Sequence, residues 1–206
     1  MNDNIEATRG AGAVLDPQRA IAEATQRRDA CATVLHSLSA LGKEDDQLLD
    51  AVQNGHLSAR AKLGKVYKVV DAFNEATRQF VACREGCSAC CKIAVSITLP
   101  EAQALAAQTG RKMVAPTRAI RRRDDAFTGT PCPFLENNQC SAYKVRPFVC
   151  RKHVSFATNA HWCEAPQCYE HDFPMAEPHG AVLAHQEIAK QSSLRGFADI
   201  RDFFPD

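Results

Sequence analysis

Residues 83–91 read Cys-Arg-Glu-Gly-Cys-Ser-Ala-Cys-Cys and place four cysteines in nine positions. The two-residue gap between Cys87 and Cys90 lets two thiolates converge on one metal ion from a single tight turn. Gly86 frees the backbone where it must turn sharply. A single pair with this spacing also occurs in redox dithiols, so the prediction of a metal site depends on the density of cysteines. Because neighbouring side chains diverge, one of Cys90 and Cys91 is available to a second metal, a cluster iron or the core.

A second group of cysteines follows after a long gap. The chain has ten cysteines, of which nine lie between Cys83 and Cys168. Four of the five later ones stand in PCPFL (131–135), CSAY (140–143), RPFVCR (146–151) and HWCE (161–164), and Cys168 follows. Folding must therefore assemble the site, and closing the intervening loop costs little because loop entropy grows only logarithmically with length.

The cellular compartment determines whether these thiols are expected to stay reduced. Residues 1–12 are polar and acidic, unlike a secretory signal, and no stretch approaches the ~18–20 apolar residues that span a bilayer. We therefore expect a cytoplasmic protein in a reducing environment, where structural disulfides are rare. Clustered thiols there indicate metal binding or redox chemistry, and we favour metal.

The composition is that of an ordinary globular protein, with 45% hydrophobic and 24% charged residues in 206. With 25 basic and 24 acidic residues, the net charge of +1 favours neither nucleic acid nor a membrane as a partner. The run Arg121-Arg122-Arg123 is followed at once by Asp124-Asp125, which favours a solvated helix face. No phosphate-binding loop or nucleophile elbow is present, so we expect a metal ion as the partner.

The spacing of apolar residues predicts a mainly α fold, with a helical arm packed on a small, irregular, cysteine-rich metal-binding domain with little β. We divide the chain into a flexible tail (1–12), a helical arm (13–82), the cysteine-cluster domain (83–173) and a C-terminal helical segment (174–206).

Three helices are predicted in the arm. The first begins at Asp16-Pro17 and ends near Gly42, with Cys31 on its apolar stripe as a core residue. The second covers residues 45–53. The third begins at the cap Ser58 and carries the chain to Cys83. Its apolar positions are Leu63, Val66, Val70, Phe73 and Phe80, and the side chains expected to face water are Lys62, Lys65, Lys68, Glu75 and Arg78.

Shorter elements are predicted downstream. The capping box Thr98–Glu101 opens a helix that ends near Gly110. The others are an extended segment at 93–97, a short helix at 116–123, a loop or hairpin turning at Asn137-Asn138, a brief helix from Pro147 that carries Cys150, a helix at 179–191 and a last turn at 199–204.

These motifs together resemble the YkgJ-type cysteine-cluster family, described as zinc- or iron-chelating domains. The resemblance covers residues 83 to about 164. It is carried by Cys87-Ser88-Ala89-Cys90-Cys91, Cys132-Pro133-Phe134-Leu135, Cys140, Tyr143, Arg146-Pro147, Cys150-Arg151 and Cys163-Glu164. The three-residue gap between Cys83 and Cys87 departs from the simplest family pattern. The resemblance implies bound zinc or iron, as ions or as an iron–sulfur cluster. A related module occurs in bacterial flagellin lysine methylases.

Eight thiols are the candidate metal ligands: Cys83, Cys87, Cys90, Cys91, Cys132, Cys140, Cys150 and Cys163. Because one structural zinc needs four ligands, this number favours either two metal ions or an iron–sulfur cluster with spare thiols. The sequence does not choose between zinc and iron, although we lean towards iron. Cys168 is a marginal candidate.

Other side chains near the thiols have alternative interpretations. His153 and His161 are either imidazole ligands or groups outside the coordination shell. Arg146 and Arg151 either donate hydrogen bonds to the thiolates or are solvated. Tyr143 and Trp162 are expected to shield the site from water.

Two functions follow from this pattern. The first is an intracellular metal-binding protein that chelates zinc or iron through clustered thiolates. The alternative is an iron–sulfur metalloenzyme or redox protein related to the flagellin lysine methylases, so enzymatic activity stays open. A dithiol oxidoreductase working through Cys87 and Cys90 is disfavoured because no βαβ pattern surrounds them.

Overall fold

The computed structural model describes residues 16–205, and the predicted tail at residues 1–12 lies outside them. Helix accounts for 55% of the structure and strand for 5%, which confirms the mainly α class with little β. The helices are α1 (Pro17–Ser37), α2 (Ser39–Asp46), α3 (Leu48–Gln53), α4 (Ala59–Thr77), α5 (Leu99–Thr109), α6 (Phe148–Lys152), α7 (Gln167–Glu170), α8 (His179–Gln191) and α9 (Ile200–Phe203). The strands are β1 (Ser96–Thr98), β2 (Leu135–Glu136), β3 (Gln139–Cys140) and β4 (Phe197–Asp199), and the 3₁₀ turns are η1 (Arg78–Phe80), η2 (Ala89–Lys92), η3 (Tyr143–Val145) and η4 (Ala160–Cys163).

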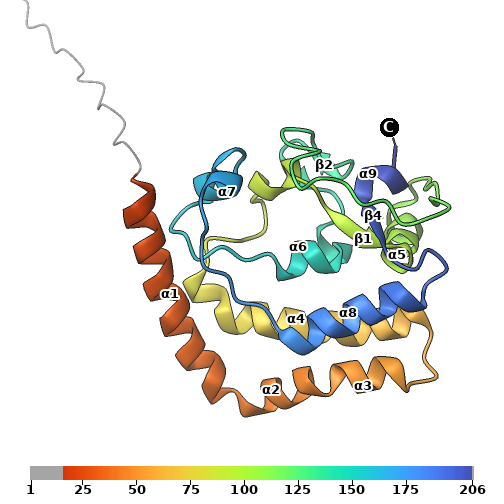
Figure 1. Cartoon of the computed structure of the whole chain (residues 1–206), viewed down its shortest axis with the longest axis horizontal. Coiled ribbons are helices and arrows are strands. Elements are labelled where there is room, and N and C mark those ends of the chain that lie inside the picture. Colours follow the sequence, from red (N-terminus) through yellow and green to blue (C-terminus); the bar gives the residue numbers. More distant parts are fainter. Residues whose placement is uncertain (1–15, 206) are drawn as a thin grey trace, which may run out of the picture.

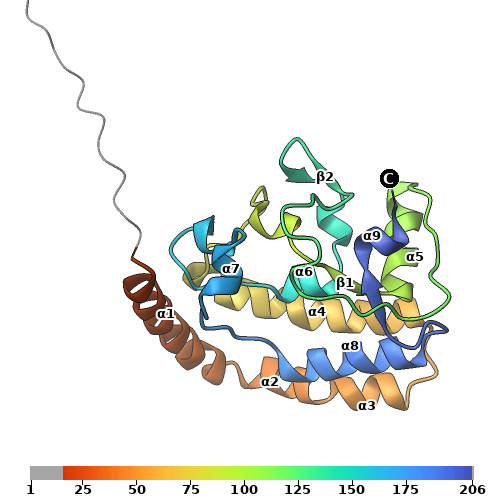
Figure 2. The same cartoon turned by 45° about the horizontal axis from the view of Figure 1, so that its top comes forward.

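Helices α4 and α8 form the base under the cysteine-rich region and run side by side (Figure 1). Figure 2 shows α6 on one side of this pair and α3 on the other. The helices share one apolar cluster, because α4 buries a face of helically spaced residues. Its members are Leu48, Val52, Leu63, Val66, Val69, Val70, Phe148, Ala181, Ala184 and Ile188. Helix α6, which carries Cys150, is thereby fixed to the helical arm.

The N-terminus of α8 is capped by a side chain from α2. The two carboxylate oxygens of Asp45 accept hydrogen bonds from the backbone N–H groups of Gly180 (2.9 Å) and Ala181 (2.7 Å). The helices come so close that a Cβ atom at position 180 would lie 1.9 Å from the backbone oxygen of Asp45. This contact therefore requires glycine at position 180.

Helix α1 begins as predicted and ends earlier. The side chain of Asp16 caps it by accepting a hydrogen bond from the Gln18 N–H at 2.9 Å. The predicted end near Gly42 is wrong, because Leu38 leaves the helical conformation with φ −90° and ψ 62°. The helix stops at Ser37, and Gly42 lies inside α2.

Cys31 is a core residue, as predicted. Its side chain is fully buried and packs in a cluster with Ala24 and Phe156. The same helix is tied to the end of the arm by Arg27, whose Nε donates to the Phe80 carbonyl at 2.8 Å.

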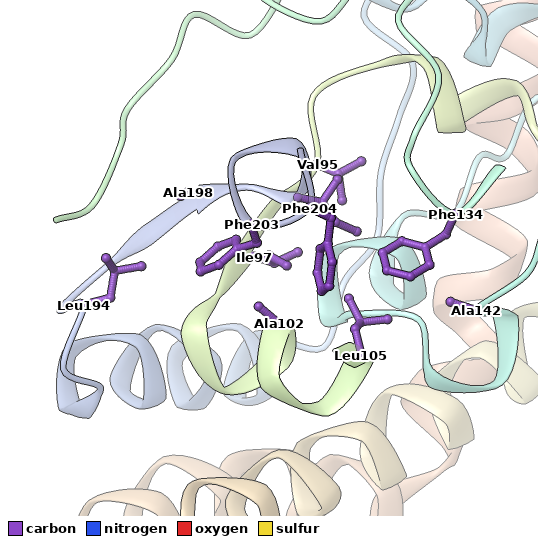
Figure 3. Close-up of a cluster of buried hydrophobic side chains, with 11 residues drawn as sticks. Val95, Ile97, Ala102, Leu105, Phe134, Ala142, Leu194, Ala198, Phe203 and Phe204 are labelled. Carbon is purple, nitrogen blue, oxygen red and sulfur yellow. The ribbon is translucent and has the colours of Figure 1, made fainter. Parts of the chain in front are cut away.

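The C-terminus returns to the cysteine-rich region through a two-stranded antiparallel sheet. Strand β1 pairs with β4, with Ile97 opposite Ala198. The buried carboxylate of Asp199 accepts a hydrogen bond from the Val95 N–H at 2.6 Å. Figure 3 shows the apolar cluster around this sheet, which comprises Val95, Ile97, Ala102, Leu105, Phe134, Ala142, Leu194, Ala198, Ile200, Phe203 and Phe204. Residues before and after position 173 thus share one core, and the predicted division of the chain at that position stays a prediction.

The predicted short helix at 116–123 is wrong, because this stretch is not helical. Its backbone bonds instead to the C-terminal segment. The Val114 N–H donates to the Phe203 carbonyl at 2.8 Å, and the Ile120 N–H donates to the Phe197 carbonyl at 2.9 Å. These long-range bonds decide the conformation because the local helix signal is weak.

Most of the remaining local predictions are confirmed. They are α4 with its Ser58 cap, α5 with its capping box and Gly110, the β2–β3 hairpin at Asn137-Asn138, α6, α8 and α9, while the extended segment at 93–97 is confirmed only at its end. Lys62 is an exception: it is only 8% exposed, and its Nζ donates to Gln191 Oε1 at 2.6 Å. Within residues 16–205, no helix combines the length and apolar composition that a bilayer crossing requires.

Candidate metal centre

The candidate centre is a cavity of about 380 Å³ under the cysteine loops. Seven of the eight candidate thiols line it: Cys83, Cys87, Cys90, Cys91, Cys132, Cys140 and Cys150. Cys163 lies outside this lining. All ten cysteines of the chain are free thiols. Segments far apart in the sequence therefore deliver their thiols to one place, as the motif spacing predicts.

The first four thiols are positioned by two tight turns after α4. Gly86 has a left-handed backbone with φ 88°, which confirms the predicted sharp turn, and the Cys87 N–H closes that turn on the Arg84 carbonyl at 3.1 Å. Cys90 and Cys91 follow on the 3₁₀ turn η2. Consecutive residues on such a turn point roughly 120° apart, yet the two thiols are joined by a hydrogen bond.

The backbone joins the first cysteine loop directly to the second. The Cys132 N–H donates to the Cys91 carbonyl at 2.7 Å, and the Gly129 N–H donates to the Lys92 carbonyl at 2.9 Å. Strands β2 and β3 then bring Cys140 back opposite Leu135. These bonds close the long gap that the sequence leaves between Cys91 and Cys132.

Arg201 of α9 clamps the same two loops from the C-terminal segment. Its guanidinium donates to the carbonyls of Ile93 (3.3 Å), Thr130 (2.6 Å) and Pro131 (3.2 Å), and to Asp199 at 3.0 Å. Its side chain is 9% exposed. Because Ile93 follows the first cysteine loop and Pro131 precedes the second, this one side chain holds both loops.

Arg201 also supplies positive charge to the thiols. The pKa of Cys91 is lowered to about 7. Its hydrogen bond with Cys90 is the largest cause, burial opposes it, and the charge of Arg201 lowers the pKa further. For Cys132, burial dominates and raises the pKa to about 11, while Arg201 acts in the opposite direction. No local motif in the sequence marks Arg201.

The two arginines for which the sequence leaves open either thiolate donation or solvation have other hydrogen-bond partners within residues 16–205. Arg151 is 7% exposed and donates to Asp71 (2.7 Å), the Arg146 carbonyl (2.8 Å) and the Lys144 carbonyl (2.9 Å). Arg146 donates to the Tyr143 carbonyl at 3.2 Å and lies over that ring. Arg151 therefore braces the loop before α6, whereas Arg146 borders the cavity.

Burial and a thiol hydrogen bond raise the pKa of three further thiols, Cys83, Cys90 and Cys150. Burial raises the pKa of Cys83 to about 11 and that of Cys150 well above its ordinary value. The pKa of Cys90 is raised mainly by its hydrogen bond to Cys91 and then by burial. Thiols in this state bind metal by exchanging protons for the cation, so the exchange depends on pH.

The two candidate histidines occupy different environments. His153 lines the cavity, and burial lowers its pKa. His161 lies outside the cavity lining and packs edge-on against Trp162, with 5.0 Å between the rings. Trp162 itself packs on Phe173 and is 4% exposed, while Tyr143 lines the cavity. Ligation by either histidine stays a prediction.

The donor set fits zinc or iron. Thiolates are soft ligands that select these metals, whereas magnesium and calcium prefer oxygen ligands. Among residues 16–205, no three or more His, Cys, Asp or Glu side chains stand in an arrangement that could hold a metal ion. The thiols thus share a cavity without facing a common centre, and coordination requires them to turn towards one. The backbone has already brought the thiols to one cavity, and each thiol can turn about a single side-chain torsion.

A helical base carries a cavity lined by free thiols, and comparison with known families gives a match in this part of the chain. Residues 82–168 match the CxxCxxCC family model, whose description is "Putative zinc- or iron-chelating domain". This match confirms the predicted resemblance to that family over residues 82–168. Neither the curated proteins nor the solved structures gave a match to the chain.

Proposed function

We propose that this protein binds zinc or iron through clustered cysteine thiolates in the reducing cytoplasm, with a metal-handling or stabilising role. One observation carries the proposal: seven thiols from separate segments line a single cavity of about 380 Å³. The proposed ligands are Cys83, Cys87, Cys90, Cys91, Cys132, Cys140, Cys150 and Cys163. His153 and Cys168 are additional candidates.

The burial of the thiols supports a metal over a bare thiol pocket. Burial pushes Cys150 and Cys132 towards their protonated forms, and the charges of neighbouring thiols act in the same direction. A divalent cation removes that repulsion, so binding stabilises the folded arrangement. The chain supplies the ligands and the shell that orients them, and Arg201 balances part of their charge.

An iron–sulfur redox protein or metalloenzyme is the second candidate. The thiol count favours it, since eight candidates exceed the four that a single zinc ion uses. A cluster would be held by four thiolates and would supply electron transfer or radical chemistry when bound. The remaining thiols and Arg146 would then border the space next to it.

Elemental analysis and a visible spectrum on the full chain, purified without oxygen, test both candidates. The proposal expects stoichiometric zinc or iron, and a large loss of it in Cys132→Ser and Cys150→Ser. Cys31→Ala is the matched control, because Cys31 is buried in a separate apolar cluster. Failure to bind either metal in the reduced, folded wild type would overturn the proposal.

The same preparation separates the two candidates. An iron–sulfur cluster gives a brown protein with inorganic sulfide equal to iron, whereas a chelating site gives metal without sulfide. Stoichiometric zinc with neither iron nor sulfide would rule against the cluster.

A further inference from the structure

We propose that the thiol-lined cavity also binds a small organic carboxylate that carries an N–H or O–H donor in the same molecule. Amino acids and hydroxy acids share this chemistry. Arg146 binds the carboxylate, and Asn74 accepts a hydrogen bond from the donor. The inference rests on the proposed chelating function and adds a second occupant to the same site.

The cavity is larger than a single ion requires. Its volume is about 380 Å³, whereas one water molecule takes up about 30 Å³ of the liquid and a bare metal ion needs less. Pockets for small molecules typically measure about 300–1,000 Å³ and combine apolar walls with a few polar groups. Val81, Leu105, Phe134 and Val154 provide such apolar walls beside the thiols. A bound ion therefore leaves room for a small organic ligand.

One wall of the cavity is a polar face of α4. Asp71, Asn74, Glu75 and Arg78 all line the cavity, and their spacing places them on one side of the helix. Another face of α4 supplies the apolar cluster shared with α8. The charges on the polar face are paired, because Asp71 accepts from Arg151 at 2.7 Å and Glu75 lies 3.6 Å from Arg78. Asn74 is the uncharged member of this wall.

Asn74 presents an acceptor that lacks a donor. Its Nδ2 donates to the Arg151 carbonyl at 2.9 Å, which fixes the orientation of the amide. Its Oδ1 is buried and has no hydrogen-bond partner among residues 16–205. Buried polar atoms nearly always have a partner, so this one is suited to a donor from a bound molecule. Because Asn74 lines the cavity, a small rotation of its side chain turns Oδ1 towards a ligand there.

Arg146 presents cationic donors to the same cavity. Its Nη1 donates to the Tyr143 carbonyl at 3.2 Å, and its guanidinium lies 4.0 Å from the centre of the Tyr143 ring. The ion pairs in the described part of the chain do not include Arg146. A guanidinium has five N–H donors in a planar fork that matches a carboxylate. The stacked side chain is therefore preorganised for an anionic group.

The two groups border one corner of the cavity. Asn74 bonds to the carbonyl of Arg151, and Arg151 Nε donates to the Arg146 carbonyl at 2.8 Å. Both groups thus flank the junction between α4 and the loop before α6. One small molecule with a carboxylate and a donor can contact both of them.

The charge of the lining also favours an anion. Among the described residues, four arginines and three acidic residues line the cavity, which leaves one positive charge in excess. Arg84 and Glu85 are exposed neighbours of opposite sign at its rim. With the pairs on α4, this leaves Arg146 as the excess cation. Thiolates on the ion add negative charge, so the ligand has to lie against Arg146 and not among the thiols.

Titration calorimetry on the full chain, reduced and loaded with the metal that it retains, tests the inference. The probes are 2-aminobutyrate, 4-aminobutyrate and the two corresponding hydroxybutyrates. Butyrate lacks the donor, and butylamine lacks the carboxylate. We expect at least one donor-bearing acid to bind one-to-one and at least about 10-fold more tightly than butyrate or butylamine. A preference for the amino or the hydroxy forms identifies the source of the donor. Metal content measured after each titration separates binding from extraction of the ion by the probe.

Two variants assign the contacts. Arg146→Gln should weaken the preferred probe by at least about 10-fold. Asn74→Ala should reduce the preferred probe to the affinity of butyrate and leave butyrate itself unchanged, a loss of selectivity that a merely structural role does not produce. Arg118→Gln is the matched control, because Arg118 is exposed and lies outside the cavity lining. Circular dichroism and metal content confirm that each variant is folded and loaded, and the comparison of probes on the wild type decides even where a variant fails to fold.

The outcomes separate this inference from the chelating function. A metal-loaded wild type that binds none of the probes overturns the inference while chelation stands. Equal affinities for butyrate and the donor-bearing acids overturn the role of Asn74. Loss of metal from folded Arg146→Gln with unchanged probe affinity assigns Arg146 to the thiolates and overturns its role here. A wild type that binds neither zinc nor iron overturns the proposed function itself.

Discussion

Replacing Glu101 with glutamine should destabilise the protein far more than its conservative shape suggests. Glu101 is 1% exposed. Its Oε1 accepts from Tyr67 Oη (3.0 Å) and the Phe148 N–H (2.7 Å). Its Oε2 accepts from the Thr98 N–H (2.8 Å), and it lies 2.9 Å from His185 Nε2. One carboxylate thereby joins α4, α5, α6 and α8.

The magnitude follows from these bonds. Glutamine has one acceptor oxygen in the position of two, so either the Thr98 or the Phe148 N–H stays buried without an acceptor, at a cost of about 1–3 kcal/mol. The pKa gives a similar figure. Burial alone would raise the pKa of Glu101, but the His185 charge and hydrogen bond and the two backbone N–H groups lower it from 4.5 to about 2. That change corresponds to about 3 kcal/mol in favour of the folded carboxylate.

Urea unfolding of the metal-loaded protein at pH 7, followed by circular dichroism, measures this loss. We expect Glu101→Gln to lower the free energy of unfolding by about 3 kcal/mol. Glu136→Gln is the matched control, because Glu136 has a 56% exposed side chain and a single partner, Arg111. That surface pair is worth less than about 0.5 kcal/mol. Equal losses in the two variants would refute the role of the buried carboxylate.

The pH dependence provides a second check with a defined sign. The folded pKa of Glu101 lies below its ordinary value of 4.5, so its contribution is fully present above pH 4.5 and is lost as the pH falls to about 2. Glutamine does not titrate there. Both proteins release metal alike in acid, so the difference between them isolates position 101. A difference that stays constant from pH 4.5 to pH 2 would contradict the assignment.

Three further substitutions test other contacts. Gly180→Ala should lower the free energy of unfolding by more than about 2 kcal/mol in a urea titration, because its Cβ atom would lie 1.9 Å from the Asp45 backbone oxygen. Gly64→Ala is the control and should not destabilise the protein, because the space around a Cβ atom at position 64 is open. Arg201→Gln removes a charge that lowers the pKa of Cys91 and opposes the increase in the pKa of Cys132. The pH of half-maximal metal release should therefore move upwards. An unchanged release curve would exclude an electrostatic effect of Arg201 on these thiols. Cys31→Ser should cost about 1–3 kcal/mol by burying a hydroxyl among apolar groups and leave the metal content unchanged; metal loss from the folded variant would place Cys31 in the site.

The sequence predicted those elements whose cause is local. A cap at Ser58, a capping box from Thr98 to Glu101 and a turn at Asn137-Asn138 each act within a few residues, and the structure contains all of them. The failures have long-range causes. Lys62 reads as exposed by its charge, yet α8 supplies Gln191 as its partner and covers it.

The candidate site likewise has features with local causes, which the sequence predicts, and features with long-range causes, which it does not. Cysteine spacing and the family resemblance selected eight thiols, of which seven share the cavity and Cys163 does not. Arg201 could not be found from sequence, since its role exists only after β4 pairs with β1 and brings α9 against the loops. Glu101 was assigned to a helix cap alone, and its contacts with Tyr67, Phe148 and His185 come from packing.

The residues that orient the thiols lie largely outside the segment that defines the family. That segment ends at residue 168, whereas the clamp Arg201 and the Glu101 partners Tyr67 and His185 lie beyond its two ends. Groups around a metal site set the orientation and basicity of its ligands and commonly change affinity by about 10–100-fold. The cysteine motif therefore specifies which donors are present, whereas α4, α8 and the β4–α9 segment determine how firmly those donors are held. We therefore expect the metal affinity of this chain to depend on its flanking helices as well as on its thiols.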